Sequence, residues 1–230
     1  MKEHIYTIPI TDALTDNCGC VLCTIEKKLE EDALCYFLGP SLMEPDGREI
    51  TNKKGFCKSH LDAMMTRNNR LGLALMLETH LKEIANSLEI KKKGGMFSKE
   101  STEKLTADSI YDVTDACAIC DKINAQMKAV ANNLAYLWGK EDDFKKNFEA
   151  SNGLCLKHTA LAISESSALG GKKKEEYIEK LKNMQKEKLN KLSENVHAFT
   201  LSFDYRNAGK KLTDDEVNSV LNSANELNGY

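Results

Sequence analysis

One cysteine–histidine pattern occurs twice in this 230-residue chain and constrains its fold more than any other feature. A C-x-x-C motif is separated by 33 or 34 residues from a C-x-x-H motif, which follows a glycine and one apolar residue. The first copy comprises Cys20, Cys23, Cys57 and His60, and the second comprises Cys117, Cys120, Cys155 and His158. Because four ligand-type residues rarely recur at such spacing by chance, we interpret the pattern as a duplicated structural unit.

Each copy carries the donor set of a tetrahedral zinc site, since zinc prefers four soft or borderline ligands such as thiolate and imidazole. A C-x-x-C turn directs two thiolates toward one point, and C-x-x-H at a helix start puts its cysteine and histidine on one face. Gly55 and Gly153 suit a tight turn with a positive φ just before the third cysteine. We therefore expect each repeat to close its own site, with Cys20 and Cys23 meeting Cys57 and His60, and Cys117 and Cys120 meeting Cys155 and His158.

The same residues permit other chemistry. Iron–sulfur clusters are an alternative cofactor, although most are held by four cysteines. Cys18 is a possible alternate ligand of the first site, and the second copy has no counterpart to it. A thiol–disulfide oxidoreductase is a further alternative, but that interpretation lacks the usual βαβ pattern and leaves the third cysteine and the histidine unexplained. Cys35, on the helix that follows the first C-x-x-C, is expected to be a core residue.

Apolar residues recur at helical spacing along most of the chain, and strand-like alternation is nearly absent. The clearest stripes are Ile25, Leu29, Ala33 and Tyr36; Leu73, Leu77, Leu81, Ile84 and Leu88; Ile119, Ile123, Met127, Val130, Leu134 and Leu137; and Ile178, Leu181, Met184, Leu189, Leu192, Val196, Phe199 and Phe203. The sequence therefore predicts an all-α helical bundle, built from two tandem metal-binding helical repeats plus a long C-terminal helix.

Lysine–glycine runs at 91–95 and 170–174 divide the chain. We expect a first helical repeat over residues 1–95, a second over 105–170, and a C-terminal part over 172–230. In that last part a helix over about 175–205 and a terminal helix pack on both repeats. Thr213 and Glu216 have the spacing of a capping box at the start of the terminal helix.

Charge and hydropathy exclude several classes of protein. The 32 basic and 35 acidic side chains give a net charge of −3, which provides no general attraction to nucleic acid or acidic membranes. The longest apolar stretch, 71–77, is too short to span a membrane, and residues 1–14 lack the apolar core of a signal peptide. Cysteines without an export signal are more typical of metal ligands than of disulfides, so we expect a cytoplasmic protein.

A series of ordered motifs runs along nearly the whole chain: HIYTIPITDAL, the first C-x-x-C, EPDGREITNKKGFCKSH, NRLGLALMLETHLKE, CAIC with GLCLKH, and FDYRN. With these motifs the chain resembles an uncharacterised bacterial family that is described only as a domain of unknown function. The resemblance implies a small cytosolic protein with paired metal-type motifs and implies no activity. The family usually has proline inside the first C-x-x-C, where this chain has Val21 and Leu22.

Four protein ligands leave no open coordination position, so the expected sites are structural and an enzymatic role is not favoured. The sequence thus predicts a metal-binding cytoplasmic protein that acts by interaction with an unknown protein or small-molecule partner. Its working surface would be a groove between the repeats or along the 175–205 helix. The competing hypothesis is a redox-responsive or metal-responsive protein that uses the same ligands. Membrane binding is not expected, and nucleic-acid binding is unlikely on charge and composition.

Overall fold

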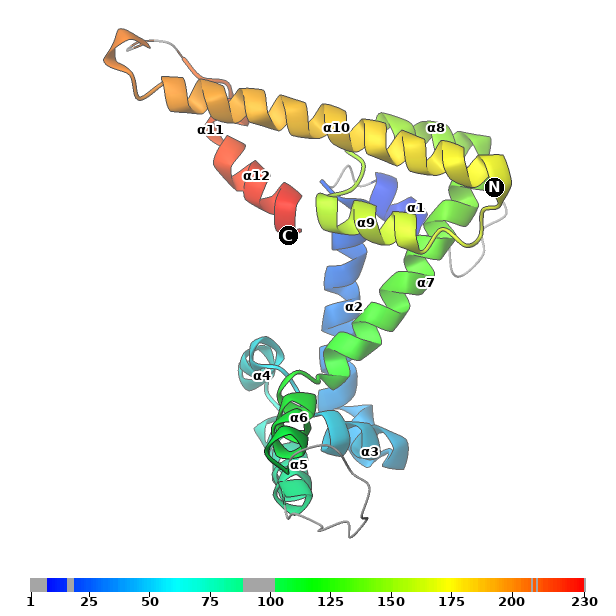
Figure 1. The fold of residues 1–230 in the computed structure, drawn as a ribbon, viewed down its shortest axis with the longest axis vertical. Helices are drawn as coiled ribbons and strands as arrows, with labels where there is room; N and C mark the ends of the chain where they lie inside the picture. Colours follow the sequence, from blue (N-terminus) through cyan, green and yellow to red (C-terminus); the bar gives the residue numbers. More distant parts are fainter. Residues whose placement is uncertain (1–7, 16–18, 89–101, 208, 210, 230) are drawn as a thin grey trace. The chain divides into compact units, whose positions relative to one another are not determined.

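The computed structural model describes residues 8–15, 19–88, 102–207, 209 and 211–229 (Figure 1). Its α-helices are α1 Ile8–Thr15, α2 Val21–Leu38, α3 Pro45–Lys54, α4 Lys58–Met65, α5 Arg70–Leu88, α6 Thr102–Thr114, α7 Ala118–Lys140, α8 Asp142–Ala150, α9 Leu156–Ser164, α10 Gly171–Leu201, α11 Asp214–Val217 and α12 Ser219–Asn228. Short 3-10 helices occupy Pro40–Met43 and Tyr205–Asn207. No strand occurs among the described residues, so the prediction of an all-α fold is confirmed.

The chain forms two compact units. Unit 1 comprises Met1–Lys27 and Gln126–Tyr230, and unit 2 comprises Lys28–Ala125. Unit 2 is thus a continuous segment inserted between two parts of unit 1, and both boundaries fall within helices, α2 and α7. These units divide the chain elsewhere than the expected repeat boundaries near residues 95 and 171. The expected linker at 91–95 lies outside the described residues.

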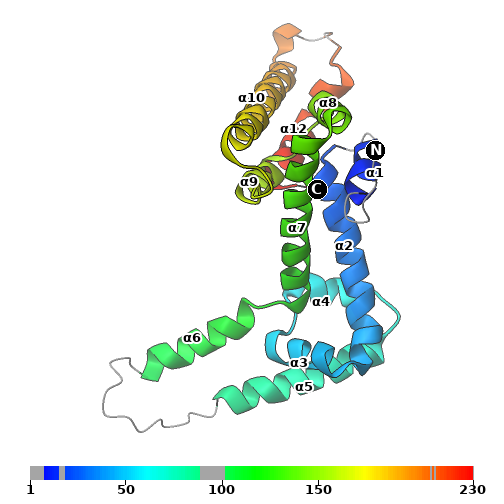
Figure 2. The ribbon, with the colours of Figure 1, turned by 90° about the vertical axis from the view of Figure 1, so that its right-hand side faces the viewer.

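Unit 1 has an aromatic core. The rings of Trp138 in α7 and Tyr177 in α10 lie 5.1 Å apart, and Phe144 and Phe148 of α8 are stacked with their centroids 6.2 Å apart. α10 packs against α9, α11 and α12. Figure 2 shows α9 and α12 beside α10. These contacts place the helices that carry one group of cysteine and histidine ligands on a well-packed support.

The long helix α10 begins earlier and ends earlier than the predicted 175–205 helix. Its first residue, Gly171, has a φ of +52°, a backbone conformation that glycine adopts without steric cost. Only Tyr177, Leu181 and Gln185 are buried along α10, and of these Leu181 alone belongs to the predicted apolar stripe. Its contacts with α9, α11 and α12 all lie within unit 1, and the expected packing on both repeats stays a prediction.

In unit 2, α3 packs against α5. Arg48 of α3 donates hydrogen bonds to the Leu75 carbonyl oxygen at 3.1 Å and to Thr79 Oγ1 at 2.8 Å, which ties the two helices together. Phe37 of α2 packs edge-on against Phe56, with ring centroids 5.7 Å apart. Phe56 is the residue before Cys57, so this aromatic contact helps fix the start of the C-x-x-H segment.

Candidate metal centres

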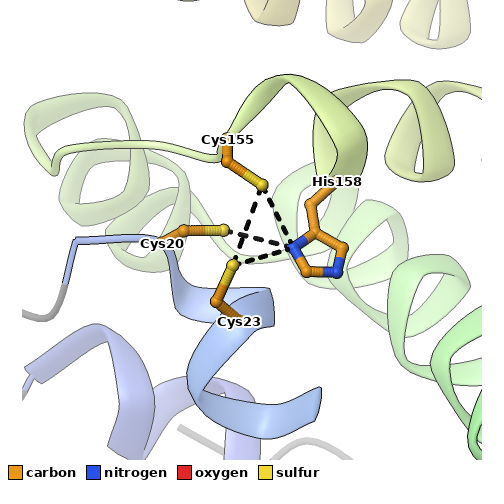
Figure 3. A group of neighbouring side chains, drawn as sticks. All are labelled: Cys20, Cys23, Cys155 and His158. Carbon is orange, nitrogen blue, oxygen red and sulfur yellow. Dashed lines mark hydrogen bonds between the residues drawn. The ribbon is translucent and has the colours of Figure 1, made fainter. Parts of the chain in front are cut away.

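All eight predicted ligand residues gather into two groups. We call the group of Cys20, Cys23, Cys155 and His158 site A, and the group of Cys57, His60, Cys117 and Cys120 site B. Within each group, one potential ligand atom per residue lies within 4.8 Å of all the others. Figure 3 shows site A, with the two cysteines at the start of α2 facing Cys155 and His158 at the start of α9. Site A lies entirely in unit 1 and site B entirely in unit 2.

The expectation that each repeat closes its own site is wrong. The C-x-x-C of the first copy meets the C-x-x-H of the second, and the C-x-x-C of the second copy meets the C-x-x-H of the first. The reason is the length of the helix that follows each C-x-x-C. α2 has 18 residues and α7 has 23. These helices extend about 27 Å and about 35 Å, so each carries the chain away from its own C-x-x-C motif.

Each ligand pair stands at the amino-terminal end of a helix. Cys57 and Cys155 are the N-cap residues of α4 and α9, and Cys20 and Cys117 directly precede α2 and α7. Unsatisfied backbone N–H groups at such ends carry a partial positive charge that favours thiolate. The turns before the C-x-x-H motifs require glycine, because Gly55 has a φ of +58° and Gly153 a φ of +66°. The positive φ expected at both glycines is thereby confirmed.

The donor atoms of site A have the spacing of a tetrahedron around one ion. His158 Nδ1 lies 3.5 Å from Cys20 Sγ, 3.3 Å from Cys23 Sγ and 3.4 Å from Cys155 Sγ. The Sγ atoms of Cys23 and Cys155 are 3.7 Å apart. Around a zinc ion with ordinary bond lengths, sulfur and nitrogen would lie about 3.5 Å apart and two sulfurs about 3.8 Å apart. The donor set therefore fits a zinc-sized ion.

Site B repeats this geometry with residues of unit 2. His60 Nδ1 lies 3.2 Å from Cys57 Sγ, 3.3 Å from Cys117 Sγ and 3.4 Å from Cys120 Sγ. The Sγ atoms of Cys57 and Cys120 are 3.8 Å apart. A backbone hydrogen bond from the Ala118 N–H to the Gly55 carbonyl oxygen, at 3.0 Å, joins the two ligand-bearing turns. Both sites thus present three sulfurs and one imidazole nitrogen toward one point.

In each site a glutamate carboxylate lies close to Nε2 of the histidine, the ring nitrogen that faces away from the sulfurs. His158 Nε2 is 3.3 Å from Glu26 Oε2, and His60 Nε2 is 3.3 Å from Glu30 Oε1. Histidines that bind metal usually present the second ring nitrogen to such a group, which fixes the tautomer and the ring orientation. Sequence reasoning missed both glutamates. Glu26 follows Cys23 by three residues, but Ile123 has the same position after Cys120, so the repeat itself gives no signal.

The electrostatics of site A reflect crowding of thiols around an imidazole. Burial by itself lowers the pKa of His158, but its contacts with Cys155, Cys23 and Glu26 raise that pKa to about 11. His158, and then Lys157, hold the pKa of the Glu26 carboxyl at about 2. Contacts with Cys155 and Cys23, together with burial, raise the pKa of the Cys20 thiol, whereas the Cys20 and Cys23 thiols lower the pKa of Cys155.

In site B the two partly exposed thiols differ in pKa. Burial by itself raises the pKa of Cys57, but hydrogen bonds from the Ser59 hydroxyl and the His60 backbone lower it to about 6. Burial and then the contact with Cys117 raise the pKa of Cys120 to about 12. The burial of the two sites differs too. Every ligand of site A is at most 2% exposed, whereas Cys57 and Cys120 of site B are only half-buried.

Comparison with protein families gives one match, which extends over almost the whole chain. A family described as "Family of unknown function (DUF6062)" matches residues 1–229. The chain belongs to this family. The resemblance inferred from the ordered motifs is therefore confirmed. Neither the curated proteins nor the solved structures give a match to this DUF6062 chain.

Two cysteines of the DUF6062 chain stand apart from these sites in different ways. Cys18 lies outside the described residues, so its expected role as an alternate ligand stays a prediction. Cys35 is exposed on α2, where its thiol contacts Glu31 Oε1 at 3.5 Å. The expectation that Cys35 is a core residue is therefore wrong, because it points away from the buried face that carries Ala33, Leu34 and Phe37. The seven described cysteines are all free of disulfides.

A cleft of about 470 Å³ opens beside site A in unit 1 of the DUF6062 chain. Its lining includes Lys188 and Lys191 of α10, and Asn222 and Asn225 of α12. Cys20 and Cys155 also border the cleft. None of the described helices combines the length and apolar character needed to cross a membrane.

Proposed function

We propose that this DUF6062 protein binds one zinc ion in site A and one in site B, as closed structural clamps. The observation that carries the proposal is the spacing of the donor atoms. In both quartets, sulfur–nitrogen distances of 3.2–3.5 Å and sulfur–sulfur distances of 3.7 and 3.8 Å match the edges of a zinc tetrahedron. Four protein ligands leave no position for a substrate, so the proposed role of each ion is to hold helices together.

The spacing also supports a single ion over an iron–sulfur cluster. In a four-iron cluster each ligand binds a different iron atom, so the four donor atoms lie farther apart than around one ion. The iron–sulfur alternative therefore requires the turns that carry the cysteines and histidines to separate. In site A these turns are held by a salt bridge of 2.8 Å between Lys157 and Glu26, which joins α9 to α2.

A thiol–disulfide oxidoreductase is less well supported, because such chemistry needs an accessible thiol in the C-x-x-C motif. Cys20, Cys23 and Cys117 are at most 2% exposed, and Cys120 alone among the four C-x-x-C cysteines is half-buried. Each of these thiols also lies within reach of an imidazole and a third sulfur, as a metal ligand would. Free thiols as ligands fit a reducing compartment, so we propose the cytoplasm as the location.

The proposed ions would stabilise the folded protein because each joins segments that are far apart in the sequence. Site A connects Cys23 to Cys155 across 132 positions, and site B connects Cys57 to Cys120 across 63. A structural zinc ion supplies on the order of 10–16 kcal/mol of apparent binding free energy, which is comparable with the stability of a whole domain. The protein is therefore expected to depend on its metal for folding.

Elemental analysis of the purified, untagged protein together with its visible absorption spectrum tests this function. The proposal requires two equivalents of zinc, one for each site, and a colourless protein. A brown protein that contains iron would support the cluster alternative instead. A folded protein that is free of metal, and keeps its melting temperature in the presence of a strong chelator, would refute both.

For the interaction surface we propose the cleft beside α10, with a small polar molecule as its ligand. The lining combines the amides of Asn222 and Asn225 with two ion pairs, Lys188 with Glu226 and Lys191 with Asp215, which suits a ligand with several hydrogen-bonding groups. A thermal-shift screen of small polar metabolites tests this proposal. A genuine ligand raises the melting temperature, and the shift is lost in Asn222→Leu but kept in Asn228→Leu, whose residue is exposed outside the cleft.

A further inference from the structure

Sites A and B have an equivalent sulfur–sulfur edge. In each, the second cysteine of the C-x-x-C lies close to the cysteine of the C-x-x-H: Cys23 and Cys155 are 3.7 Å apart, and Cys120 and Cys57 are 3.8 Å apart. The two edges have the same chemistry and nearly the same length. Any difference in their reactivity must therefore come from what surrounds them.

In site A the end of the last helix covers this edge. Gly229, which follows α12, approaches so closely that a Cβ atom there would lie 3.4 Å from Cys23 Sγ and 3.8 Å from Cys155 Sγ. α12 packs on both α9 and α10. Its backbone thus shields the two sulfurs from solvent, in agreement with their exposures of 2% and 1%.

A buried polar relay holds this cover in place. Thr159, next to His158 on α9, donates a hydrogen bond of 2.9 Å to Gln185 Oε1 of α10. Gln185 in turn donates through Nε2 to Glu226 of α12, which is 4% exposed and also pairs with Lys188 at 2.6 Å. A buried carboxylate without such partners lowers the stability of the fold, because its charge is then uncompensated. The contacts of Glu226 with Gln185 and Lys188 therefore hold α12 against α10.

In site B the equivalent edge is left open by the part of unit 2 that the structure describes. Cys57 and Cys120 are half-buried, although their partner Cys117 is 2% exposed and His60 is 6% exposed. Cys57 and Cys120, whose sulfurs lie 3.8 Å apart, are thus the two residues of site B that solvent reaches, while Cys117 and His60 are buried. A small uncharged reagent can therefore attack site B at this edge and cannot attack site A in the same way.

We propose that the Cys57–Cys120 edge of site B is an oxidation site for hydroperoxides, and that its oxidation releases the metal of site B while site A keeps its own. The release of metal rests on the proposed function. The selectivity for these two cysteines rests only on their exposure and on the cover over site A.

The oxidation of site B consumes one hydrogen peroxide molecule per protein molecule. One of the two thiolates attacks a peroxide oxygen, the O–O bond breaks, and a sulfenic acid forms as hydroxide leaves. The other thiolate attacks the sulfenic sulfur, the S–O bond breaks, and a second hydroxide leaves as the disulfide forms. Two protons convert the hydroxides to water, so the two sulfurs lose two electrons and the peroxide gains them. Only His60 and Cys117 then remain as ligands, and the ion dissociates.

The experiment uses the full-length protein with its metal content measured beforehand, in a Cys35→Ser background, which removes the exposed thiol that the described residues carry outside both sites. Limiting hydrogen peroxide is added, metal release is followed with a chromogenic chelator, and disulfides are located by peptide mapping. One equivalent should be released at least about tenfold faster than the other, together with a Cys57–Cys120 disulfide. Equal release rates, earlier release from site A, or a first disulfide through any other cysteine would overturn the proposal.

A matched pair of variants tests the role of the cover. Glu226→Ala removes the carboxylate that contacts both Gln185 and Lys188, and so loosens the docking of α12. The oxidation rate of Cys23 and Cys155 should then come close to the rate at site B. Glu226→Gln keeps an acceptor for Gln185 and should largely restore protection. If Glu226→Ala leaves site A as slow as before, the cover is not what protects it. A protein that is purified without metal would refute the zinc function, whereas the location of the first disulfide would still test the selectivity.

Discussion

Glu26 Oε2 lies 3.3 Å from His158 Nε2, on the opposite side of the imidazole ring from the three sulfurs of site A. Because Nδ1 faces the sulfurs, a neutral His158 that binds a metal ion through Nδ1 would carry its proton on Nε2, on the side of this carboxylate. The carboxylate therefore favours the tautomer that can bind a metal ion. Glu30 has the same relation to His60 in site B, and the two glutamates stand one helical turn apart on α2.

The first prediction concerns these two carboxylates. Glu26→Ala should weaken zinc binding at site A by about 10–100-fold, because the imidazole loses its orienting partner, and should leave site B unchanged. Glu30→Ala should do the reverse. Competition with a chromogenic chelator measures both affinities. Glu26→Asp, which keeps the charge, should recover part of the loss. If both alanine variants weakened the same site, the assignment of partners would be wrong.

The second prediction tests which cysteines share a site. Cys20→Ser and Cys155→Ser disrupt the same quartet, so the double variant should lose one equivalent of metal, as each single variant does. The double variant of Cys20→Ser and Cys57→Ser disrupts both quartets and should lose two. Metal analysis of the purified variants distinguishes this pairing from one within each repeat. Pairing within repeats would give the opposite stoichiometries for these two double variants.

A third prediction follows from the raised pKa of His158. With a pKa of about 11 in the absence of metal, its imidazole is protonated at neutral pH, and Cys20, whose pKa is also raised, is a thiol. Both must lose a proton to bind a metal ion, so binding releases protons and the affinity of site A rises with pH. Titration calorimetry in two buffers with different ionisation enthalpies should give different apparent enthalpies. Identical enthalpies would contradict a protonated His158 and a protonated Cys20 in the metal-free protein.

The fourth prediction compares the two turn glycines. Gly55→Ala should destabilise unit 2 by about 1–3 kcal/mol or more, because its φ of +58° is strained for alanine and the added Cβ would overlap His80 Nε2. His80 is itself fixed by a hydrogen bond of 2.6 Å to the Asn52 carbonyl oxygen, so it cannot move freely.

Gly153→Ala is the matched control in unit 1. It has a similar φ of +66°, but its Cβ would meet only the flexible end of Met184, at 3.2 Å. Denaturant unfolding and metal content should therefore show the larger effect for Gly55→Ala. An equal loss in the two variants would mean that backbone strain alone decides the cost.

The eight cysteines and histidines that gather into sites A and B, and the helical fold, could be predicted from the sequence because both depend on short spacings. Thiol and imidazole pairs three residues apart, and apolar residues at helical intervals, indicate local geometry directly. Which C-x-x-C motif meets which C-x-x-H motif could not be predicted, because each C-x-x-C motif fits either C-x-x-H motif equally well. That choice depends on where the long helices α2 and α7 carry the chain.

The residues that surround the two sites could not be predicted from the sequence either. Glu26 and Glu30 are two of the three glutamates in a helix rich in charge, and nothing in their spacing marks them as partners of histidine. Cys35 was expected in the core because cysteine is often buried, but its position on α2 turns it toward solvent. The cover that Gly229 gives to site A joins residues more than 200 positions apart and leaves no local pattern.

The crossed pairing has a consequence for a chain that emerges residue by residue from the ribosome. Site B is complete once Cys120 has emerged, but Cys20 and Cys23 meet neither of their native partners until Cys155 and His158 follow. Until then, Cys57 and His60 could complete a full but incorrect set of four donors with them. If the proposed ions bind, a metal ion captured at that stage would hold the chain in a kinetic trap, and correct maturation would depend on late metal delivery or on ready dissociation from the wrong quartet.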